Sequence, residues 1–455
     1  MDARDVRLEP ELVNRLARRT EALAPLGSLS TEKVTLTAPE LTALERLAER
    51  LANTYPYGEP RYVGQMLKPP HPLAWAAYAT AMLLNPNNHA LDGGPATAEM
   101  EKEAVAAIAA MFGLREPLGH LPSSGTIANL EALWVARELH PGSAILFGEN
   151  AHYTHERMCR VIGVRAESLP QDEAARIDLD ALERRLGVGD VGTVVATLGT
   201  TALGAVDPLP EILALRAKYE FRVHVDAAYG GYFSLIADML DEPARRAYAA
   251  IGQADSIVID PHKHGLQPYG CGCVLFRDLD VGRLYKHDSP YTYFTSKELH
   301  LGEISLECSR AGAAAVALWA TQQLLPLTPD GEFARGLKRG RAAALELDRR
   351  LRADERFEPF AAGPPELDIV VWAMRAATLG EASERAQGVF DACAARDLHL
   401  ALVKLPGAWF AAEGGEQTET VTCLRSVLMK PEHEEWLGRI WERLKAACGE
   451  VLRHE

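Results

Sequence analysis

The chain has 455 residues, of which 47% are hydrophobic and 24% are charged, and its formal net charge is −15 at pH 7. This length predicts one large domain with one or two smaller appendages rather than a single small core. The acidic balance argues against a nucleic-acid or anionic-membrane partner, because either one requires a basic surface. The charged N-terminal stretch lacks the apolar segment of a secretory signal, and no apolar run approaches the ~18 residues of a membrane span. We therefore expect a cytoplasmic enzyme or binding protein.

The seven cysteines are scattered through the chain and odd in number, which is not typical of a disulfide framework. Cys271 and Cys273 flank one glycine, but no second pair or histidine stands at zinc-finger spacing. Because a structural zinc ion needs a full set of ligands, the sequence predicts no metal site.

The N-terminal region, residues 1–72, mixes helical stretches with a proline-rich connection. Leucine and alanine recur at helical spacing over residues 40–53, which predicts a helix there. The connection follows over residues 55–72.

The second region, residues 73–325, alternates short apolar runs with helical segments. This pattern is typical of an α/β domain with a mainly parallel sheet. Continuous runs of Val, Ile and Leu suit strands that are buried on both faces. The clearest predicted strands cover residues 143–149, 191–199, 221–228, 255–263 and 272–278.

The third region, residues 326–455, is predicted to form a smaller α+β domain. It opens with a long helix rich in Arg, Ala and Leu, and strand-like segments cover residues 367–375 and 418–429. A glycine-rich stretch near residue 415 is interpreted as a surface loop. A helix over residues 431–448 closes the region.

Polar side chains gather where the predicted strands of the large domain end. In open α/β sheets, ligands bind beyond the carboxyl ends of the strands. These ends therefore present an acid, a lysine with an adjoining histidine, hydroxyl groups and a further histidine. In chain order the residues are His152, Thr200, Thr201, Asp226, Asp260, His262 and Lys263.

A Ser-Gly-Thr turn precedes a predicted helix upstream of these strands. A helix N-terminus offers unpaired N–H groups and a positive dipole end, which suits a phosphate group. We expect the contacts to come from Ser124, Gly125 and Thr126, although no Walker-type lysine follows. The apolar residues on one face of the helix are Ile127, Leu130, Leu133 and Trp134.

Each feature taken singly has a plainer interpretation: a solvated lysine, a turn-closing Asp, an ordinary loop histidine or a simple helix cap. Taken together, they fit one chemistry. A lysine can hold an aldehyde cofactor as a Schiff base, and an acid can keep a pyridinium nitrogen protonated. An aromatic side chain can stack on the ring, and a helix N-terminus can hold the phosphate. The combination predicts pyridoxal 5′-phosphate.

The sequence resembles the group II pyridoxal-dependent decarboxylases from about residue 60 to residue 430. The most specific motif, DSIVIDPHKHG at residues 255–265, matches their D-P-H-K or N-P-H-K signature, and HVDAAYGG precedes it at the right distance. The resemblance implies an α/β fold of the fold-type I, aspartate-aminotransferase-like class. It also implies decarboxylation of an L-amino acid to the corresponding amine and CO2. An aldehyde synthase or a carbon–carbon lyase on the same fold remains the alternative, and a non-catalytic relative would be expected to have lost Lys263 or Asp226.

The resemblance also implies roles for the residues around the cofactor. Lys263 would form the Schiff base, and His262 beside it would contact the phosphate. Asp226 would pair with the pyridine nitrogen, with Ala228 packed against the ring. His152, in the segment AHYTHER, would stack on the other face of the ring.

Further roles follow from the same resemblance. Thr201 would lie near the ring hydroxyl or the phosphate, and Gln65 at the edge of the cofactor. Arg425 would hold a substrate carboxylate. Ser309 would reach the phosphate of the neighbouring subunit's cofactor, since the resemblance implies a homodimer with shared active sites. His89 would lie near the substrate, or its segment would only build the dimer interface.

The proton donor to the product is expected in the segment HDSPYTYFTSKELHLGE. Tyr293 is the better match, and Tyr291 is the second candidate. Counting back from the CSR segment instead places Leu299 or His300 at this position. The alternatives remain open in the sequence.

Overall fold

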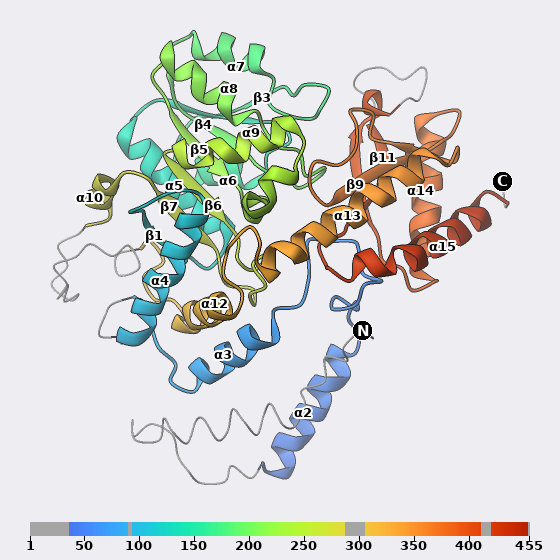
Figure 1. Ribbon diagram of the computed structural model, residues 1–455, viewed down its shortest axis with the longest axis horizontal. Helices are drawn as coiled ribbons and strands as arrows, with labels where there is room; N and C mark the ends of the chain where they lie inside the picture. Colours follow the sequence, from blue (N-terminus) through green and yellow to red (C-terminus); the bar gives the residue numbers. More distant parts are fainter. Residues whose placement is uncertain (1–35, 90–92, 287–304, 411–419, 454–455) are drawn as a thin grey trace.

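The structure is a computed structural model that describes residues 36–89, 93–286, 305–410 and 420–453. Two β-sheets, each flanked by helices, occupy different parts of the chain (Figure 1). None of the helices within the described ranges is long and apolar enough to cross a membrane.

The larger sheet has seven strands in the order β1-β7-β6-β5-β4-β2-β3. Neighbours from β6 through to β3 pair in parallel, whereas β7 is antiparallel to both β6 and β1. The predicted mainly parallel sheet is therefore confirmed. Its strands are β1 (Leu118–His120), β2 (Ala144–Gly148), β3 (Ala166–Leu169), β4 (Val191–Thr197), β5 (Arg222–Asp226), β6 (Ser256–Ile259) and β7 (Cys273–Phe276).

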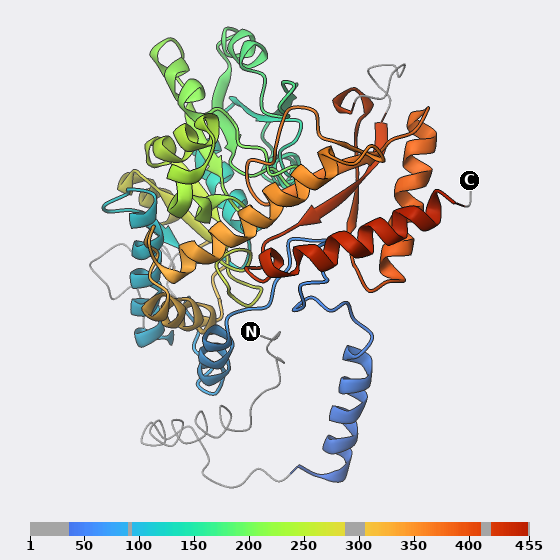
Figure 2. The ribbon, with the colours of Figure 1, turned by 45° about the vertical axis from the view of Figure 1, so that its right-hand side comes forward.

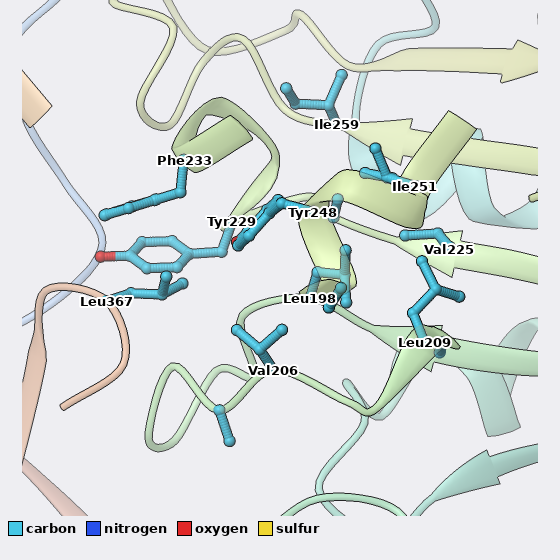
Figure 3. Packing of buried hydrophobic residues seen from close by; sticks show 14 of the residues in the cluster. Leu198, Val206, Leu209, Val225, Tyr229, Phe233, Tyr248, Ile251, Ile259 and Leu367 are labelled. Atoms are coloured by element: carbon cyan, nitrogen blue, oxygen red, sulfur yellow. The ribbon is translucent and has the colours of Figure 1, made fainter. Parts of the chain in front are cut away.

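Both faces of this sheet are buried, as the continuous apolar runs predict. Along β6, Ile257 and Ile259 belong to a cluster that includes residues of α8 and α9, whereas Val258 packs with α5 on the opposite face. Figure 3 shows part of the first cluster, which includes Val225, Ile259 and the aromatic side chains of Tyr229, Phe233 and Tyr248.

The helices of the large-sheet region are α3 (Pro72–Met82), α4 (Pro95–Met111), α5 (Gly125–Leu139), α6 (Thr154–Val161), α7 (Leu179–Leu186), α8 (Leu209–Ala214), α9 (Glu242–Ala250), α10 (Gly282–Tyr285) and α12 (Gly312–Leu324). Short 3-10 helices are η3 (Leu215–Ala217), η4 (Gly231–Met239), η5 (Ile251–Gln253) and η6 (Leu279–Val281). Helix α12 packs against α3 and α4 at one end of the region.

The buried face of α5 differs from the expected apolar stripe. Leu133 is fully buried, but Ile127, Leu130 and Trp134 are only partly buried. The other buried residues of α5 are Gly125, three alanines, Val135 and two polar residues. One of these is Glu131, whose Oε2 lies 2.8 Å from His120 Nε2 and accepts a hydrogen bond from the Tyr285 hydroxyl at 2.9 Å. Partners of this kind let a polar residue replace an apolar one inside the core.

The smaller sheet has four antiparallel strands in the order β10-β11-β9-β8. Its strands are β8 (Phe357–Pro359), β9 (Ile369–Met374), β10 (Ala401–Pro406) and β11 (Thr420–Val427). Its helices are α13 (Glu332–Arg352), α14 (Leu379–Ala394) and α15 (His433–Val451), with the 3-10 helix η7 (Gly407–Trp409). Ile369 and Val371 of β9 belong to the cluster shared with the large sheet, whereas Val370 and Trp372 face a second cluster with α14 and α15.

Helix α13 runs between the two sheets (Figures 1 and 2). Phe333 and Leu337 in its first half belong to the large-sheet cluster, and Leu347 and Leu351 in its second half belong to the small-sheet cluster. Helix α2 (Ala38–Leu51) instead projects away from both sheets and has no buried residue.

Candidate active site

The carboxyl ends of three neighbouring strands meet at a pocket. Thr197 and Asp226 are the last residues of β4 and β5, and Asp260 follows directly after β6. Because these strands are adjacent and parallel, their ends lie side by side. The pocket and its open mouth together hold about 420 Å³ of unfilled space. It is lined by Gly125, Thr126, Asn129, His152, Thr154, Thr197, Gly199, Thr201, Asp226, Ala228, Tyr229, Asp260 and Lys263.

Lys263 presents its amine in this pocket. Its Nζ lies 2.9 Å from Oδ2 of Asp260, and its side chain is 22% exposed, whereas that of Asp260 is only 3% exposed. The Lys263 N–H also donates to the Asp260 carbonyl oxygen at 2.9 Å, which closes a turn between them. The amine is therefore held in place and can still be reached from outside.

His262 is fixed beside this ion pair. Its Nδ1 donates to the carbonyl oxygen of Cys271 at 2.6 Å, since a carbonyl can only accept. Its Nε2 lies 3.6 Å from Oδ2 of Asp260. Burial lowers the pKa of His262, against the opposing charge of Asp260, so the ring is neutral at physiological pH.

Asp226 is buried at the back of the pocket and is surrounded by hydrogen-bond donors. His155 Nε2 lies 2.8 Å from its Oδ2, and the Asn129 amide donates to the same oxygen at 3.3 Å. The Ala228 N–H donates to Oδ1 at 3.0 Å. Burial alone opposes ionisation of Asp226, but the contacts with His155 and Ala228 and the charge of Lys263 together hold its pKa below the ordinary value. A buried, ionised carboxylate of this kind can neutralise a cation in the pocket.

His152 lies on another wall of the pocket, just before α6. Its Nδ1 lies 2.6 Å from the Thr154 hydroxyl oxygen, and the Thr154 N–H also points to this nitrogen at 3.3 Å. Because a backbone N–H can only donate, Nδ1 is the accepting nitrogen. Burial lowers the pKa of His152, with the charge of Asp226 opposing it. The pocket therefore has a neutral aromatic ring on this side.

The N-terminus of α5 opens onto the pocket through Gly125 and Thr126. Ser124 is the N-cap, and its hydroxyl accepts from the Ile127 N–H at 3.3 Å. A Cβ on Gly125 would lie 2.6 Å from both carboxylate oxygens of Asp260. Only glycine leaves room for this approach, so the turn fixes the helix N-terminus beside the ion pair of Lys263.

Arg425 lies on β11 of the smaller sheet and is 4% exposed. Its Nη1 reaches Gln65 Oε1 at 3.4 Å, whereas Nε and Nη2 have no hydrogen-bond partner among the residues that the structure describes. A buried guanidinium with two unsatisfied donors costs free energy. The arrangement suits an anionic ligand.

Six of the predicted residues do not line this pocket in the chain's own fold: Gln65, His89, Ser124, His262, Ser309 and Arg425. The Asn87 amide donates to the exposed hydroxyl of Ser309 at 3.1 Å, and His89 lies on the same connection. Neither residue lines the pocket. The expected proton donor Tyr293 and its alternatives Tyr291, Leu299 and His300 lie outside the described residues.

Sequence reasoning missed His155 and Asn129, although both touch Asp226. Both belong to helices behind the strand ends, where a search for polar strand ends does not look. One signal was present: His155 follows His152 by three residues in the same segment.

The fold, the pocket and the lysine and aspartate within it define a pyridoxal-phosphate enzyme of fold type I. Residues 72–375 match the family model described as the pyridoxal-dependent decarboxylase conserved domain. The chain therefore belongs to the pyridoxal-dependent decarboxylase family, and the resemblance to the group II decarboxylases is confirmed. The cofactor of this family is pyridoxal 5′-phosphate, as predicted.

Similar proteins carry decarboxylase names. The L-tyrosine decarboxylase of Enterococcus faecium is 29% identical over 391 residues, which cover 64% of this chain and 64% of the relative. The probable L-aspartate decarboxylase of Halobacterium salinarum is 32% identical over 273 residues, covering 60% of this chain and 72% of the relative. The match spans less than two thirds of the tyrosine decarboxylases of E. faecium and Levilactobacillus brevis, at 64% and 62% of their lengths.

Solved structures share the fold. Oryza sativa TDC with PLP and tryptamine has a TM-score of 0.80 and 19% identity, covering 98% of this chain and 99% of that chain. Mouse CSAD has a TM-score of 0.77 and 22% identity, covering 94% of this chain and 91% of that chain. At these identities the likeness shows the fold, and it confirms the predicted fold class.

Proposed function

We propose that this chain decarboxylates an L-amino acid to the corresponding amine and CO2, with pyridoxal 5′-phosphate held by Lys263. The observation that carries the proposal is that Lys263 and Asp226 line one pocket at the ends of adjacent parallel strands. Family membership supports the same chemistry.

The residues of the pocket fit the cofactor. Lys263 supplies an amine for the aldehyde, and Asp226 supplies a buried, ionised carboxylate for the pyridine nitrogen. The N-terminus of α5, at Gly125 and Thr126, supplies N–H groups for the phosphate. Among the described residues, Oδ1 of Asp226 accepts a hydrogen bond from Ala228 alone, and so has a lone pair left for a further donor.

The remaining pocket residues would orient the reactants. When bound, the cofactor supplies an electron sink, and the protein selects which bond to the α-carbon breaks. His152 and Ala228 would pack on the ring, Thr201 would contact its hydroxyl or phosphate, and Ser124 and His262 would support the phosphate site. Tyr293 would return the proton to the product.

Arg425 and Gln65 would bind the substrate. The two unsatisfied donors of the buried Arg425 guanidinium favour a carboxylate ligand. Gln65 accepts from Arg425 Nη1 and would keep the guanidinium oriented. The charge of the ligand would compensate the cost of burying Arg425.

The active form would be a cytoplasmic homodimer. Ser309 and His89 lie away from the chain's own pocket, which is consistent with contributions to a partner's site. Exposed leucines along α2 offer an apolar surface for a second copy: Leu41, Leu44, Leu47 and Leu51 are between 49% and 61% exposed. Light scattering at several protein concentrations measures the mass and checks the dimer.

The substrate is best sought among the amino acids named for the relatives, tyrosine and aspartate. We would measure amine and CO2 release from L-Tyr, L-Asp, L-Glu, L-Phe, L-Trp, L-His and diaminobutyrate. Wild type is expected to produce amine from one of them. Lys263→Ala should abolish the reaction, because no other described residue in the pocket carries an amine. Lys404→Ala, an exposed lysine on β10, is the matched control and should leave the rate unchanged.

Amine production that survives in Lys263→Ala contradicts the proposal, and so does the absence of amine from every substrate in wild type. Tyr293→Phe separates decarboxylation from aldehyde formation. If Tyr293 is the proton donor, this variant yields less amine and more aldehyde with oxygen consumption.

A further inference from the structure

His155 contacts Asp226 from behind the pocket. It lies in the first turn of α6, and its Nε2 is 2.8 Å from Asp226 Oδ2. The side chain of His155 is completely buried and does not line the pocket. It therefore cannot touch the substrate and acts only through Asp226.

The surroundings of the His155 ring determine which of its two nitrogens carries a hydrogen. Because a carboxylate can only accept, Nε2 of His155 carries the hydrogen. The other nitrogen, Nδ1, is buried and has no hydrogen-bond partner in the part of the chain that the structure describes. A second proton on Nδ1 would be an unpaired buried donor, which is costly. His155 therefore donates to Asp226 through Nε2, and this hydrogen bond holds the pKa of Asp226 below its ordinary value.

The second donor to the same oxygen is also held in place. The Asn129 amide nitrogen donates to Asp226 Oδ2, and the Asn129 oxygen lies 2.8 Å from His224 Nε2. The Nδ1 of His224 lies 2.8 Å from the Ser256 hydroxyl. This chain of contacts from β6 through β5 to α5 fixes the amide orientation. Oδ2 is thus occupied by two donors, whereas Oδ1 accepts from Ala228 alone among the described residues.

We infer that His155 is a positioning residue for the reaction. Its hydrogen bond keeps Asp226 ionised, so that the proton shared between Asp226 and the pyridine nitrogen resides on the nitrogen. The inference rests on the proposed function, in which Asp226 pairs with that nitrogen. Hydrogen bonds to a carboxylate stabilise its charged form. Without His155, the pair shifts toward a neutral carboxylic acid and an unprotonated pyridine, which withdraws electrons less well.

The test uses holoenzyme loaded with pyridoxal phosphate labelled with ¹⁵N in the ring, whose chemical shift reports protonation of the nitrogen. Wild type should show the protonated signal across pH 6–9. His155→Phe removes the donor while filling similar space, and should move the signal toward the unprotonated value. We expect kcat to fall about 10- to 100-fold, as loss of one charge-assisted hydrogen bond predicts, with little change in KM. His155→Gln retains a side-chain N–H and should restore most of the wild-type signal.

His120→Phe is the control for burial alone. His120 is also fully buried and contacts a carboxylate, Glu131, at 2.8 Å, but this pair lies outside the pocket. The control should lower the melting temperature without moving the ring signal. An unchanged ring signal in His155→Phe overturns the inference, as does a change of equal size in His155→Gln and His155→Phe. If His155→Phe does not fold, His155→Ala takes its place as the variant without a donor: a ring signal shifted toward the unprotonated value supports the inference, and a wild-type signal at every pH overturns it.

The inference and the proposed function fail in different ways. If wild type binds no cofactor or its ring nitrogen is never protonated, the proposed role of Asp226 is wrong. If wild type carries a protonated ring and His155→Phe matches it at every pH, the proposed function stands and the role of His155 does not.

Discussion

Asp368 is a second buried carboxyl group close to the pocket. Its pKa is raised, whereas the pKa of Asp226 is lowered. It accepts a hydrogen bond from the Tyr229 hydroxyl at 2.5 Å, and His264 Nε2 lies 3.4 Å from its other oxygen. Figure 3 shows the ring of Tyr229 between Phe233 and Leu367. Burial raises the pKa of Asp368 to about 6, and the Tyr229 hydrogen bond and the charge of Lys68 only partly oppose it.

This raised pKa predicts a pH dependence of stability. Between pH 4 and 6 the folded chain keeps the Asp368 proton while the unfolded chain has released it, so stability falls as the pH rises through this window. From the shift of 3.8 to about 6, the contribution is at most about 3 kcal/mol. Asp368→Asn should flatten this part of the curve, as measured by urea unfolding at several pH values. Asp330→Asn, at an exposed loop position, should retain the wild-type slope; equal slopes in all three proteins would contradict the prediction.

Residues that act directly at the pocket could be predicted from the sequence, and those that act through a neighbour could not. Lys263, Asp226 and His152 follow strand ends, and strand ends of a parallel sheet meet at one edge. Asn129 and His155 come from helices, and nothing local in the sequence says that their side chains reach Asp226. Their roles depend on how α5 and α6 pack on the sheet, which is a tertiary property.

At the scale of elements, the start of α5 is the most constrained part of the site. A Cβ on Gly125 meets both oxygens of the Asp260 carboxylate, which is itself paired with Lys263. Gly125→Ala should therefore displace Asp260 and weaken cofactor binding by about tenfold or more, in line with the cost of overpacking a buried site. Titration of the apoprotein with pyridoxal phosphate, followed by absorbance, measures the effect.

Gly438→Ala is the matched change at an unconstrained helical position. No atom lies within 4 Å of a Cβ placed on Gly438 in α15. Alanine favours the helix over glycine by up to about 1 kcal/mol, so this variant should be more stable and bind cofactor normally. Wild-type cofactor affinity in Gly125→Ala would show that Asp260 can move at no cost.

The elements that escaped prediction are short or partly exposed. The apolar runs of β4, β5 and β6 can be recognised as strands in the sequence, because a parallel strand is buried on both faces and is therefore apolar throughout. The strands β1 and β8 have three residues each, too few for a periodic signal. Strand β10 is at a sheet edge and carries the exposed Lys404, so its pattern does not alternate cleanly.

At the scale of the whole molecule, the two sheets share core residues. Strand β9 contributes alternate side chains to the large-sheet cluster and to the small-sheet cluster. The boundary predicted between residues 325 and 326 falls just before α13, but the packing continues across it. The sequence distinguishes the regions by their element pattern, and it contains no sign of how far their cores merge.

Shared packing predicts that a cavity in one cluster weakens the other. Leu337→Ala lies in the large-sheet cluster and Leu347→Ala in the small-sheet cluster, both on α13. Each should cost about 2–5 kcal/mol of unfolding free energy, the usual cost of truncating a buried leucine. Hydrogen exchange should accelerate in the slowest amides of both β5 and β11 in either variant. Leu324→Ala, at a position 54% exposed, should leave exchange unchanged; acceleration confined to the sheet nearer the mutation would contradict shared packing.

Helix α13 also restricts the position of Arg425 relative to Lys263. The arginine belongs to the small sheet, whereas Lys263 belongs to the large one, and a loose hinge between them would let the two groups drift apart. A single 21-residue helix that packs in both clusters keeps the two sheets at a fixed separation. Under the proposed function, the span between the amine and the guanidinium would be set before any ligand arrives, and amino acids would be selected by whether their carboxylate reaches across it.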